Sequence, residues 1–352
     1  MKAALWYDTK DIRVETIPEP SLERDQVKVK VYYCGICGSD LHEYLAGPIF
    51  IPVEEAHPIS KDKAPIVMGH EFAGVVSAVG EDVTGIKVGD RVCVEPIYSC
   101  GTCHSCRKGH YNVCEQLGFI GLSGGLGGFS EYSVVPSKMI HKIPDNMTWE
   151  QAALVEPAAV AVHAVRQSDM KIGDSVAVIG TGPIGLLVIQ AAKAAGASKI
   201  VAVEVSPERR DFAEQAGADL IIDPLERDPI QAIKEFTNEL GVDVAFEVAG
   251  IEATIYTAIE STKPEGNVVN ISIWEKPASI PVNQFILTER KMTSIIAYRN
   301  IFPQVIQLIA NGQIRATELI TKKISLDQIV TEGFEALTKN KNQIKILVDP
   351  SL

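Results

Sequence analysis

Seven cysteines stand out in the 352-residue sequence, because their types and spacing could do chemistry. All seven lie between Cys34 and Cys114, and four of them, at positions 100, 103, 106 and 114, form a C-x2-C-x2-C-x7-C pattern. Four thiolates at such short spacing are typical of one tetrahedral zinc ion, with no position left for a substrate. The spacing therefore predicts a structural zinc site made of Cys100, Cys103, Cys106 and Cys114.

An iron–sulfur cluster and a nucleic-acid-binding zinc finger are the alternative interpretations of these four cysteines. The ferredoxin run ends in x3-Cys-Pro, whereas here seven residues precede Cys114 and Glu115 follows it. A nucleic-acid partner would favour a basic protein, but the net charge is -12 and no basic cluster is present. We expect a small-molecule substrate and no nucleic-acid partner.

A second set of polar residues offers ligands for a catalytic metal. Cys37 lies in C-G-I-C-G-S-D-L-H, His70 in G-H-E-F-A-G and Glu156 in L-V-E-P. Together they supply one thiolate, one imidazole and one carboxylate, and a catalytic zinc takes three protein ligands and leaves one position open. Each residue alone is weak evidence, since a single cysteine or histidine is more often structural.

A dinucleotide-binding pattern follows further along the chain. Gly180, Gly182 and Gly185 form G-x-G-x-x-G between a predicted strand and a predicted helix, which is the context that this motif requires. The three glycines permit a tight turn, a close approach of the pyrophosphate and close helix–strand packing. The glycine-rich segment 124–128 lacks that context, so we interpret it as a flexible loop.

The next predicted strand ends at Glu204, 19 residues after Gly185. An acidic side chain there hydrogen-bonds the ribose 2′-hydroxyl and repels a 2′-phosphate, so NAD is favoured over NADP. Arg209 could stack on the adenine, although Arg209 and Arg210 could also bind a phosphate.

The elements that must position these residues divide the chain into two expected domains. Residues 1–155 are mostly short valine-rich runs bounded by turn residues, such as those at 27–33 and 90–96, which predict strands. Residues 156–297 alternate strands with helices, which predicts a parallel sheet. We place the tail, 298–352, with the first domain, and the structural zinc lobe within 95–115.

Within the second domain we expect strands at 175–180, 199–205, 220–223 and 242–250, and helices at 183–197, 206–218 and 230–240. The tail contains a predicted helix at 302–312 and a predicted strand at 343–348. The start of the sequence lacks the apolar core of a signal peptide, and no apolar run is long enough to span a bilayer. A cytoplasmic protein without a membrane partner is expected.

Taken in order, these motifs resemble those of the zinc-containing medium-chain alcohol dehydrogenases. The resemblance runs from end to end and implies a GroES-like catalytic domain plus a Rossmann domain, an α/β and β-rich two-domain fold. It implies Cys37, His70 and Glu156 as ligands of a catalytic zinc, with Glu71 as an alternative or exchanging ligand. It also implies that NAD contacts Ile184, Glu204, Arg209, Ile273 and Tyr298.

Within the family the sequence is most similar to the polyol and diol branch, which includes sorbitol, threonine and butanediol dehydrogenases. The segments 47–52, 272–274 and 295–299 resemble those of the 2,3-butanediol dehydrogenases. The resemblance implies oxidation of 2,3-butanediol to acetoin and the reverse, together with diacetyl reduction. Ala297 stands where sorbitol dehydrogenases carry an arginine, which favours a less hydroxylated substrate. Ile51, Phe119 and Leu122 are implied as pocket residues.

In the expected mechanism, zinc stabilises the alkoxide, Ser39 accepts the hydroxyl proton and His42 carries it towards solvent. The alternative for Ser39 is a role as a helix cap. The alternatives for the protein are a sorbitol or L-threonine dehydrogenase, or an NAD-binding zinc protein without catalysis. The family resemblance implies a homodimer or homotetramer.

Overall fold

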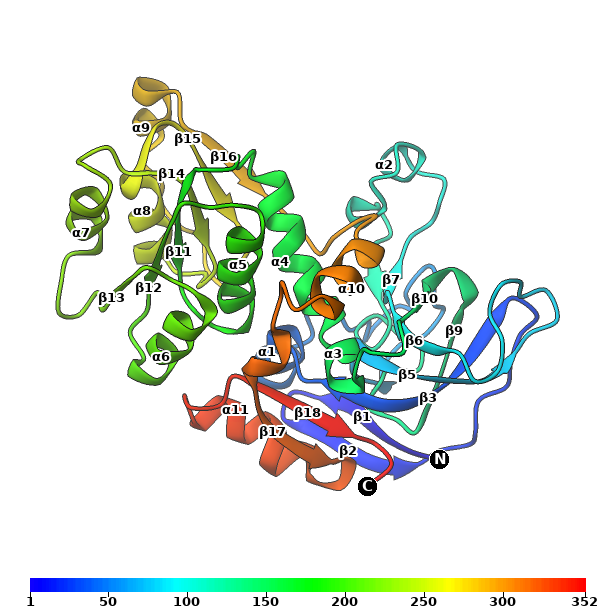
Figure 1. The fold of residues 1–352 in the computed structure, drawn as a ribbon. Coiled ribbons are helices and arrows are strands. Elements are labelled where there is room, and N and C mark those ends of the chain that lie inside the picture. Colours follow the sequence, from blue (N-terminus) through cyan, green and yellow to red (C-terminus); the bar gives the residue numbers. More distant parts are fainter. The chain divides into compact units, whose positions relative to one another are not determined.

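The computed structural model describes all residues from 1 to 352, and the chain folds into two compact units (Figure 1). The first comprises Met1–Glu156, Phe302–Ala310 and Ile320–Leu352, and the second comprises Pro157–Ile301 and Asn311–Leu319. By these contacts the tail segment 311–319 groups with the second unit. The predicted domain bounds, 1–155 with 298–352 and 156–297, stay a prediction.

The first unit is built on a seven-stranded sheet in the order β10-β6-β5-β3-β18-β17, with β9 also paired to β3. Its central strand shows why the sequence forms it: Val27, Val29 and Val31 alternate with more exposed residues and lie buried. The strands are β3 (Gln26–Gly35), β5 (Glu71–Val79), β6 (Arg91–Val94), β9 (Tyr132–Pro136), β10 (Ile140–Lys142), β17 (Ile320–Ser325) and β18 (Lys345–Asp349).

Two smaller sheets and several helices complete the first unit. The small sheets are β2-β1-β4 and the β7-β8 pair. Their strands are β1 (Lys2–Asp8), β2 (Asp11–Thr16), β4 (Ile66–Val67), β7 (Ile97–Tyr98) and β8 (Gly118–Phe119). The α-helices are α1 (Gly38–Ala46), α2 (His104–Arg107), α3 (Trp149–Ala153), α10 (Phe302–Ala310) and α11 (Glu335–Lys339), and α4 (Val155–Gln167) starts at the end of this unit.

The C-terminal strand β18 pairs antiparallel with β3, so that Leu347 lies opposite Gly35 and Val348 opposite Cys34. The predicted strand at 343–348 is therefore confirmed, and it lies next to the segment that carries Cys37. The helix predicted at 302–312 is also present, as α10. The paired strands β18 and β3 come from distant parts of the sequence.

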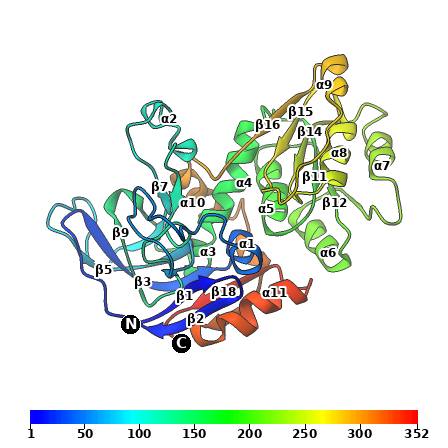
Figure 2. The ribbon, with the colours of Figure 1, turned by 180° about the vertical axis from the view of Figure 1, so that it is seen from behind.

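The second unit has a six-stranded sheet, in which all strands run parallel in the order β13-β12-β11-β14-β15-β16. Helix α5 packs on β11 and β12, and α8 packs on β14 and β15 from the opposite face (Figures 1 and 2). The predicted doubly wound parallel sheet is confirmed. Its strands are β11 (Ser175–Ile179), β12 (Lys199–Val203), β13 (Leu220–Ile222), β14 (Val242–Glu247), β15 (Thr262–Asn270) and β16 (Lys291–Ser294).

The crossover helices of this unit begin at sequence signals that favour helix starts. Proline occupies the first helical position of α5, α6 and α7, and Ser206 and Asp228 cap α6 and α7 with their side chains. The helices are α5 (Pro183–Ala194), α6 (Pro207–Ala216), α7 (Pro229–Phe236), α8 (Glu252–Ser261) and α9 (Val282–Thr288). Helices α7 and α8 contribute Ile233, Ile255 and Ile259 to the core cluster that contains the strand residues Ala177 and Val201.

The glycine-rich segment 124–128 is a loop, as predicted, but its packing differs from a flexible loop. Gly127 and Gly128 are buried, and Gly128 N–H donates to the carbonyl of Gly69. A Cβ at Gly128 would lie 2.5 Å from a Phe72 atom and 2.7 Å from Cys34 Sγ. The glycines are therefore required for close packing beside the second set of polar residues, and the expectation of flexibility was wrong.

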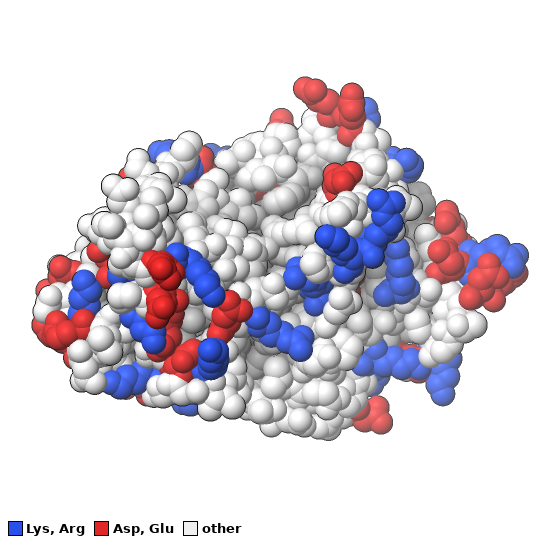
Figure 3. All heavy atoms as spheres, turned by 90° about the horizontal axis from the view of Figure 1, so that it is seen from above, with Lys and Arg blue, Asp and Glu red and all other residues white.

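None of the helices combines the length and the apolar character needed to cross a membrane. On the face of the molecule in Figure 3, Lys and Arg side chains and Asp and Glu side chains both occur among large uncharged areas. Both kinds of charge therefore contribute to this face, although the chain as a whole carries a net charge of -12.

Candidate metal centres and cofactor site

The four-cysteine segment between β7 and β8 gathers its thiols around one point. The sulfur atoms of Cys100, Cys103, Cys106 and Cys114 all lie within 4.8 Å of one another. Sulfur ligands about 2.3 Å from a tetrahedral zinc are about 3.8 Å apart, so the observed spacing fits one zinc ion. All four cysteines are free of disulfides.

Backbone N–H groups also prepare these thiols for a metal. Cys100 Sγ accepts from Thr102 N–H and Cys103 N–H, at 3.4 and 3.3 Å, and Gln116 N–H donates to Cys114 Sγ at 3.3 Å. The Thr102 and Cys103 donors lower the pKa of the Cys100 thiol below its ordinary value, whereas burial raises the pKa of Cys106. Because zinc binds the thiolate, the loop stabilises the form of cysteine that a metal requires.

A second group forms where β3 ends and β5 begins. These strands are antiparallel and their register places Gly35 opposite Glu71, which brings the residues just after β3 close to those just before β5. Ligand atoms of Cys37, His70 and Glu71 lie within 4.8 Å of one another. A thiolate, an imidazole and a carboxylate at this spacing fit a catalytic zinc.

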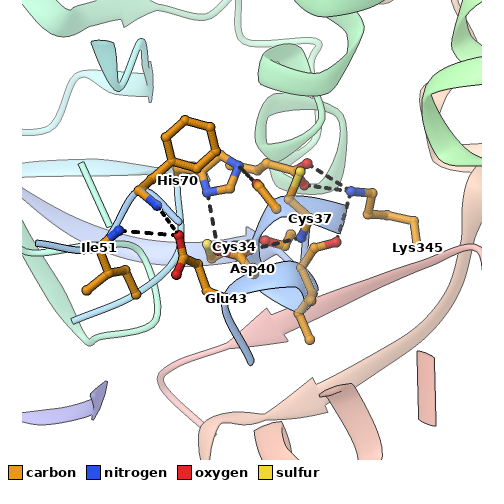
Figure 4. A network of polar contacts seen from close by, with 12 residues as sticks. Cys34, Cys37, Asp40, Glu43, Ile51, His70 and Lys345 are labelled. Carbon is orange, nitrogen blue, oxygen red and sulfur yellow. Dashed lines mark hydrogen bonds and ion pairs between the residues drawn. The ribbon is translucent and has the colours of Figure 1, made fainter. Parts of the chain in front are cut away.

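Asp40 organises this group from the first turn of α1. Its Oδ2 accepts from Cys37 N–H at 2.9 Å, and its Oδ1 lies 3.3 Å from His70 Nδ1 (Figure 4). Asp40 and His70 are both buried. A carboxylate facing one imidazole nitrogen orients the ring so that the other nitrogen, Nε2, can bind a metal. Asp40 was not predicted as a site residue, although it lies inside the motif that drew attention to Cys37.

The charges in this group shift the pKa of His70. Burial by itself lowers the pKa of the imidazole, but the negative charges of Asp40 and Cys37 raise it, and the resulting pKa is well above the ordinary value. A site that attracts a proton to His70 in this way also attracts a metal cation.

Ser39 and His42 lie on the same helix as Asp40. The Oγ of Ser39 lies 3.3 Å from His70 Nε2, on the side of the ring where a metal would bind. The cap bond of α1 comes from Asp40 rather than Ser39, so the structure gives no support to the cap role of Ser39. His42 follows Ser39 by three residues, which places both side chains on one face of α1.

Glu71 forms a buried ion pair that sequence reasoning missed. Lys345 Nζ lies 2.9 and 2.8 Å from the two oxygens of Glu71 and also donates to the carbonyl of Ile36 (Figure 4). Burial lowers the pKa of Lys345, but Glu71, Cys37 and Glu156 raise it above its ordinary value. The one available signal was a lysine inside an otherwise apolar strand.

The predicted ligand Glu156 is buried in the first turn of α4. It is not part of the group whose ligand atoms lie within 4.8 Å of one another, although its charge acts on Lys345. Of the predicted pocket residues, Ile51, Phe119 and Leu122 are all buried.

The dinucleotide fingerprint lies between β11 and α5 of the second unit. Gly180 has a φ of 97°, which favours glycine, and a Cβ at Gly185 would lie 2.1 Å from the carbonyl oxygen of Gly180. Gly182 caps α5, so the positive end of the helix faces the loop where a pyrophosphate would bind. Ile184 is in the first turn of the same helix.

Glu204 and Arg209 lie beside this loop. Glu204 Oε2 accepts from Thr181 N–H at 2.9 Å and from Thr181 Oγ1 at 3.1 Å, while its Oε1 accepts from Ser206 N–H. Arg209 approaches Gly182, and its buried Nε has no hydrogen-bond partner. Arg210, by contrast, forms an ion pair with Asp223.

The residues predicted to contact the nicotinamide half differ in exposure. Ile273 is partly exposed and Tyr298 is fully buried in the second unit. Ala297, beside Tyr298, has a φ of 47°, a left-handed backbone that costs an alanine of order 1 kcal/mol. Glu247 was not predicted, yet it is buried and accepts from Ala249 and Gly250 N–H, and it also binds the Ser272 hydroxyl.

Two family models match these units in order. The alcohol dehydrogenase GroES-like domain matches residues 23–145, and the zinc-binding dehydrogenase model matches residues 183–311. The chain is 55% identical to (R,R)-butanediol dehydrogenase of Bacillus subtilis over the full length of both proteins. It belongs to the zinc-containing medium-chain alcohol dehydrogenases.

Other relatives agree with this assignment. Sorbitol dehydrogenase of Bacillus subtilis is 37% identical over 100% of this chain and 98% of the relative. The crystal structure of 2R,3R-butanediol dehydrogenase from Bacillus subtilis matches with a TM-score of 0.94 and 54% identity, over 99% of each chain. The chain is thus an alcohol dehydrogenase with a GroES-like domain and a Rossmann domain, and zinc and NAD are its cofactors.

Proposed function

We propose that this dehydrogenase interconverts 2,3-butanediol and acetoin with NAD, and that it also reduces diacetyl. The observation that carries the proposal is the 55% identity to (R,R)-butanediol dehydrogenase over the whole of both chains. The group around Cys37 and His70 supplies the chemistry that such a reaction needs. The absence of an arginine at Ala297 supports a diol with few hydroxyl groups over a hexitol.

Cys37, His70 and Glu156 are the proposed ligands of the catalytic zinc. The Glu71 carboxylate is engaged through both oxygens by Lys345. If Glu71 bound the metal, Lys345 would lose its buried counter-charge, which carries a large free-energy cost. Glu156 is the other buried carboxylate near this lysine, and Glu71 then acts as an exchanging ligand or as the partner that neutralises Lys345.

When bound, zinc supplies a Lewis acid that lowers the pKa of an alcohol hydroxyl, and NAD+ supplies the hydride acceptor. Ser39 accepts the hydroxyl proton, because its Oγ lies beside the metal-facing nitrogen of His70. His42, one helical turn further along α1, takes the proton from the site towards solvent. Asp40 holds His70 in the orientation that this geometry requires.

Gly180, Gly182, Ile184 and Gly185 would bind the pyrophosphate end of NAD, and Ile273 and Tyr298 its nicotinamide half. Glu204 favours NAD because its carboxylate beside the fingerprint loop would repel a 2′-phosphate. Arg210 is held by Asp223, which leaves Arg209 as the arginine beside the loop. Arg209 is proposed to contact the adenosine half of NAD.

A homodimer or homotetramer in the cytoplasm is also proposed. Strand β16 is at the edge of its sheet, and edge strands tend to pair with other chains unless they are covered. The neighbouring helix α9 exposes Val282, Ile286 and Leu287. Light scattering after gel filtration would test this, and a monomer at micromolar concentration would contradict it.

The direct test is NADH formation by purified protein with NAD+ and each stereoisomer of 2,3-butanediol, with sorbitol and L-threonine in parallel. We expect turnover on the butanediols, strongest on one isomer, and loss of that turnover after chelation. Activity on sorbitol or threonine alone would reject the proposed substrate while leaving the family and the metal site in place. Silence on all substrates, with both zinc ions bound, would favour a non-catalytic NAD-binding protein.

A further inference from the structure

Glu43 is a fully buried carboxylate that the proposed mechanism does not use. It lies on α1, three residues after Asp40, so the two acidic side chains share a face of this helix. Asp40 contacts Cys37 and His70, whereas Glu43 points to a different part of the same unit (Figure 4). A buried carboxylate needs hydrogen-bond donors, and its donors show what it does.

The donors of Glu43 are three consecutive backbone N–H groups of one loop. Ile49 donates to Oε2 at 3.0 Å, and Phe50 and Ile51 donate to Oε1, the latter at 3.3 Å. The loop begins at Gly47, where a Cβ would lie 2.6 Å from a Glu43 carboxylate oxygen, so glycine permits this close approach. The carboxylate thus fixes the backbone of residues 49–51, which we term the clamped loop.

The clamped loop reaches the segment beside His70 through an aromatic contact. The rings of Phe50 and Phe119 meet edge to face with centroids 5.9 Å apart. Two residues after Phe119, Gly121 packs so closely on Gly69 that a Cβ would lie 2.4 Å from the Gly69 carbonyl oxygen. Gly69 directly precedes His70, so the segment against which Phe50 packs also packs on the chain beside the metal group.

We infer that Glu43 is a positioning residue that sets alcohol specificity, because it holds Phe50 and Ile51 as an apolar wall for the carbon chain of the substrate. One helix then places two parts of the site: its first turn holds His70 through Asp40, and its second turn holds the wall. The wall suits the methyl groups of a branched secondary alcohol. This inference rests on the proposed function.

The test compares Glu43→Gln with Glu55→Gln, a matched change of an exposed carboxylate that follows the clamped loop. Loss of the charged acceptor should weaken hydrogen bonds of the kind that contribute a factor of about ten or more. We expect kcat/KM for 2,3-butanediol to fall about tenfold, mainly through KM, and that for the smaller propan-2-ol to fall much less. KM for NAD+ and zinc content should not change.

Two further measurements test the hydrogen bonds of Glu43 and the role of Phe50 separately. Hydrogen exchange at the amides of Ile49, Phe50 and Ile51 should be slow in the wild type and in Glu55→Gln and fast in Glu43→Gln. Phe50→Ala leaves the hydrogen bonds of Glu43 in place. It should also lower kcat/KM for 2,3-butanediol more than kcat/KM for propan-2-ol, and so it tests the inference even if Glu43→Gln does not fold.

Equal losses on both alcohols, or an unchanged ratio in Phe50→Ala, would overturn the inference. So would fast exchange of the three amides in the wild type. If the wild type oxidised no alcohol, the proposed function would fail, and the exchange data alone would then decide whether Glu43 clamps the loop.

Discussion

The two metal-binding groups of this protein are built in opposite ways. In the four-cysteine lobe, all ligands come from 15 consecutive residues, and N–H groups of the same segment stabilise the thiols. In the second group the proposed ligands follow β3, precede β5 and start α4, Asp40 contacts Cys37 and His70, and Lys345 pairs with Glu71. The first site depends on its own loop, whereas the second depends on the fold of the whole first unit.

This difference explains what each site can do. A loop that satisfies a metal with four of its own thiolates leaves no position for a substrate, so its metal stabilises the local fold. A site assembled from separate elements can leave a coordination position open and can place Ser39 next to it. The following experiments test this contrast, in order of decreasing expected effect.

Cys37→Ser and Cys103→Ser form a matched pair, one in each group. Cys37→Ser should lower kcat/KM by about 10³-fold or more, because it removes a ligand of a metal that contributes several kcal/mol to catalysis. Cys103→Ser should lower the melting temperature and leave the KM for alcohol of the folded fraction unchanged. Each variant should lose one of the two zinc ions, measured by mass spectrometry. If both changes lowered turnover equally, the proposed difference in role between the two metal groups would be wrong.

Ser39→Ala tests whether the second group carries proton transfer as well as metal binding. We expect kcat to fall about 10²- to 10⁴-fold, the usual contribution of a positioned proton acceptor, with both zinc ions retained. Ser137→Ala, in the short helix Ser137–Met139, is the control. Full activity of Ser39→Ala would show that the relay is wrong.

Asp40→Asn tests whether the second group depends on support beyond its ligands. The amide keeps the shape of Asp40 but loses the charge that faces His70. Zinc affinity of this site should therefore fall about 10- to 100-fold, with no change at the lobe. Competition with a fluorescent chelator would measure both sites. An unchanged affinity would indicate that the ligands alone define the site.

The pH dependence of zinc uptake should differ between the two groups, because zinc displaces protons from different side chains in each. The pKa of His70 is raised, so between pH 6.5 and that raised pKa the metal-free imidazole holds a proton that zinc must displace. Affinity at this site should fall about tenfold per unit as pH decreases in that window. At the lobe the pKa of the Cys100 thiol is lowered but that of Cys106 is raised, so zinc must still displace a thiol proton there at neutral pH, and the proton competition should extend to higher pH than at His70. Zinc titrations of metal-free protein at several pH values would measure the affinity of each group. The same dependence of affinity on pH at both groups would contradict this prediction.

The same contrast explains what could be predicted from the sequence. The alternation of strands and helices, the glycine fingerprint and the four cysteines are local patterns, and the fold class deduced from them is confirmed. The lobe required only the spacing of Cys100, Cys103, Cys106 and Cys114.

Residues that act across long separations could not be predicted. Lys345 reaches Ile36 over 309 positions, and no local pattern shows that a strand near the end of this sequence pairs with β3. Glu71 and Glu156 are both buried carboxylates close to Lys345, so residue type alone does not decide which binds zinc. Glu43 is one acidic residue in a helix until its three backbone donors are known.

The pairing of β18 with β3 has a consequence for how the protein is made. The ribosome synthesises β3 early and must then produce the entire second unit before β18 emerges. Until then only the end of the central strand, at Cys34 and Gly35, lacks a partner on one side, because β9 already pairs with residues 26–30, while the intervening nucleotide-binding sheet can already fold. Lys345 joins Glu71 only at this late stage, so the catalytic group is completed after the fingerprint loop exists.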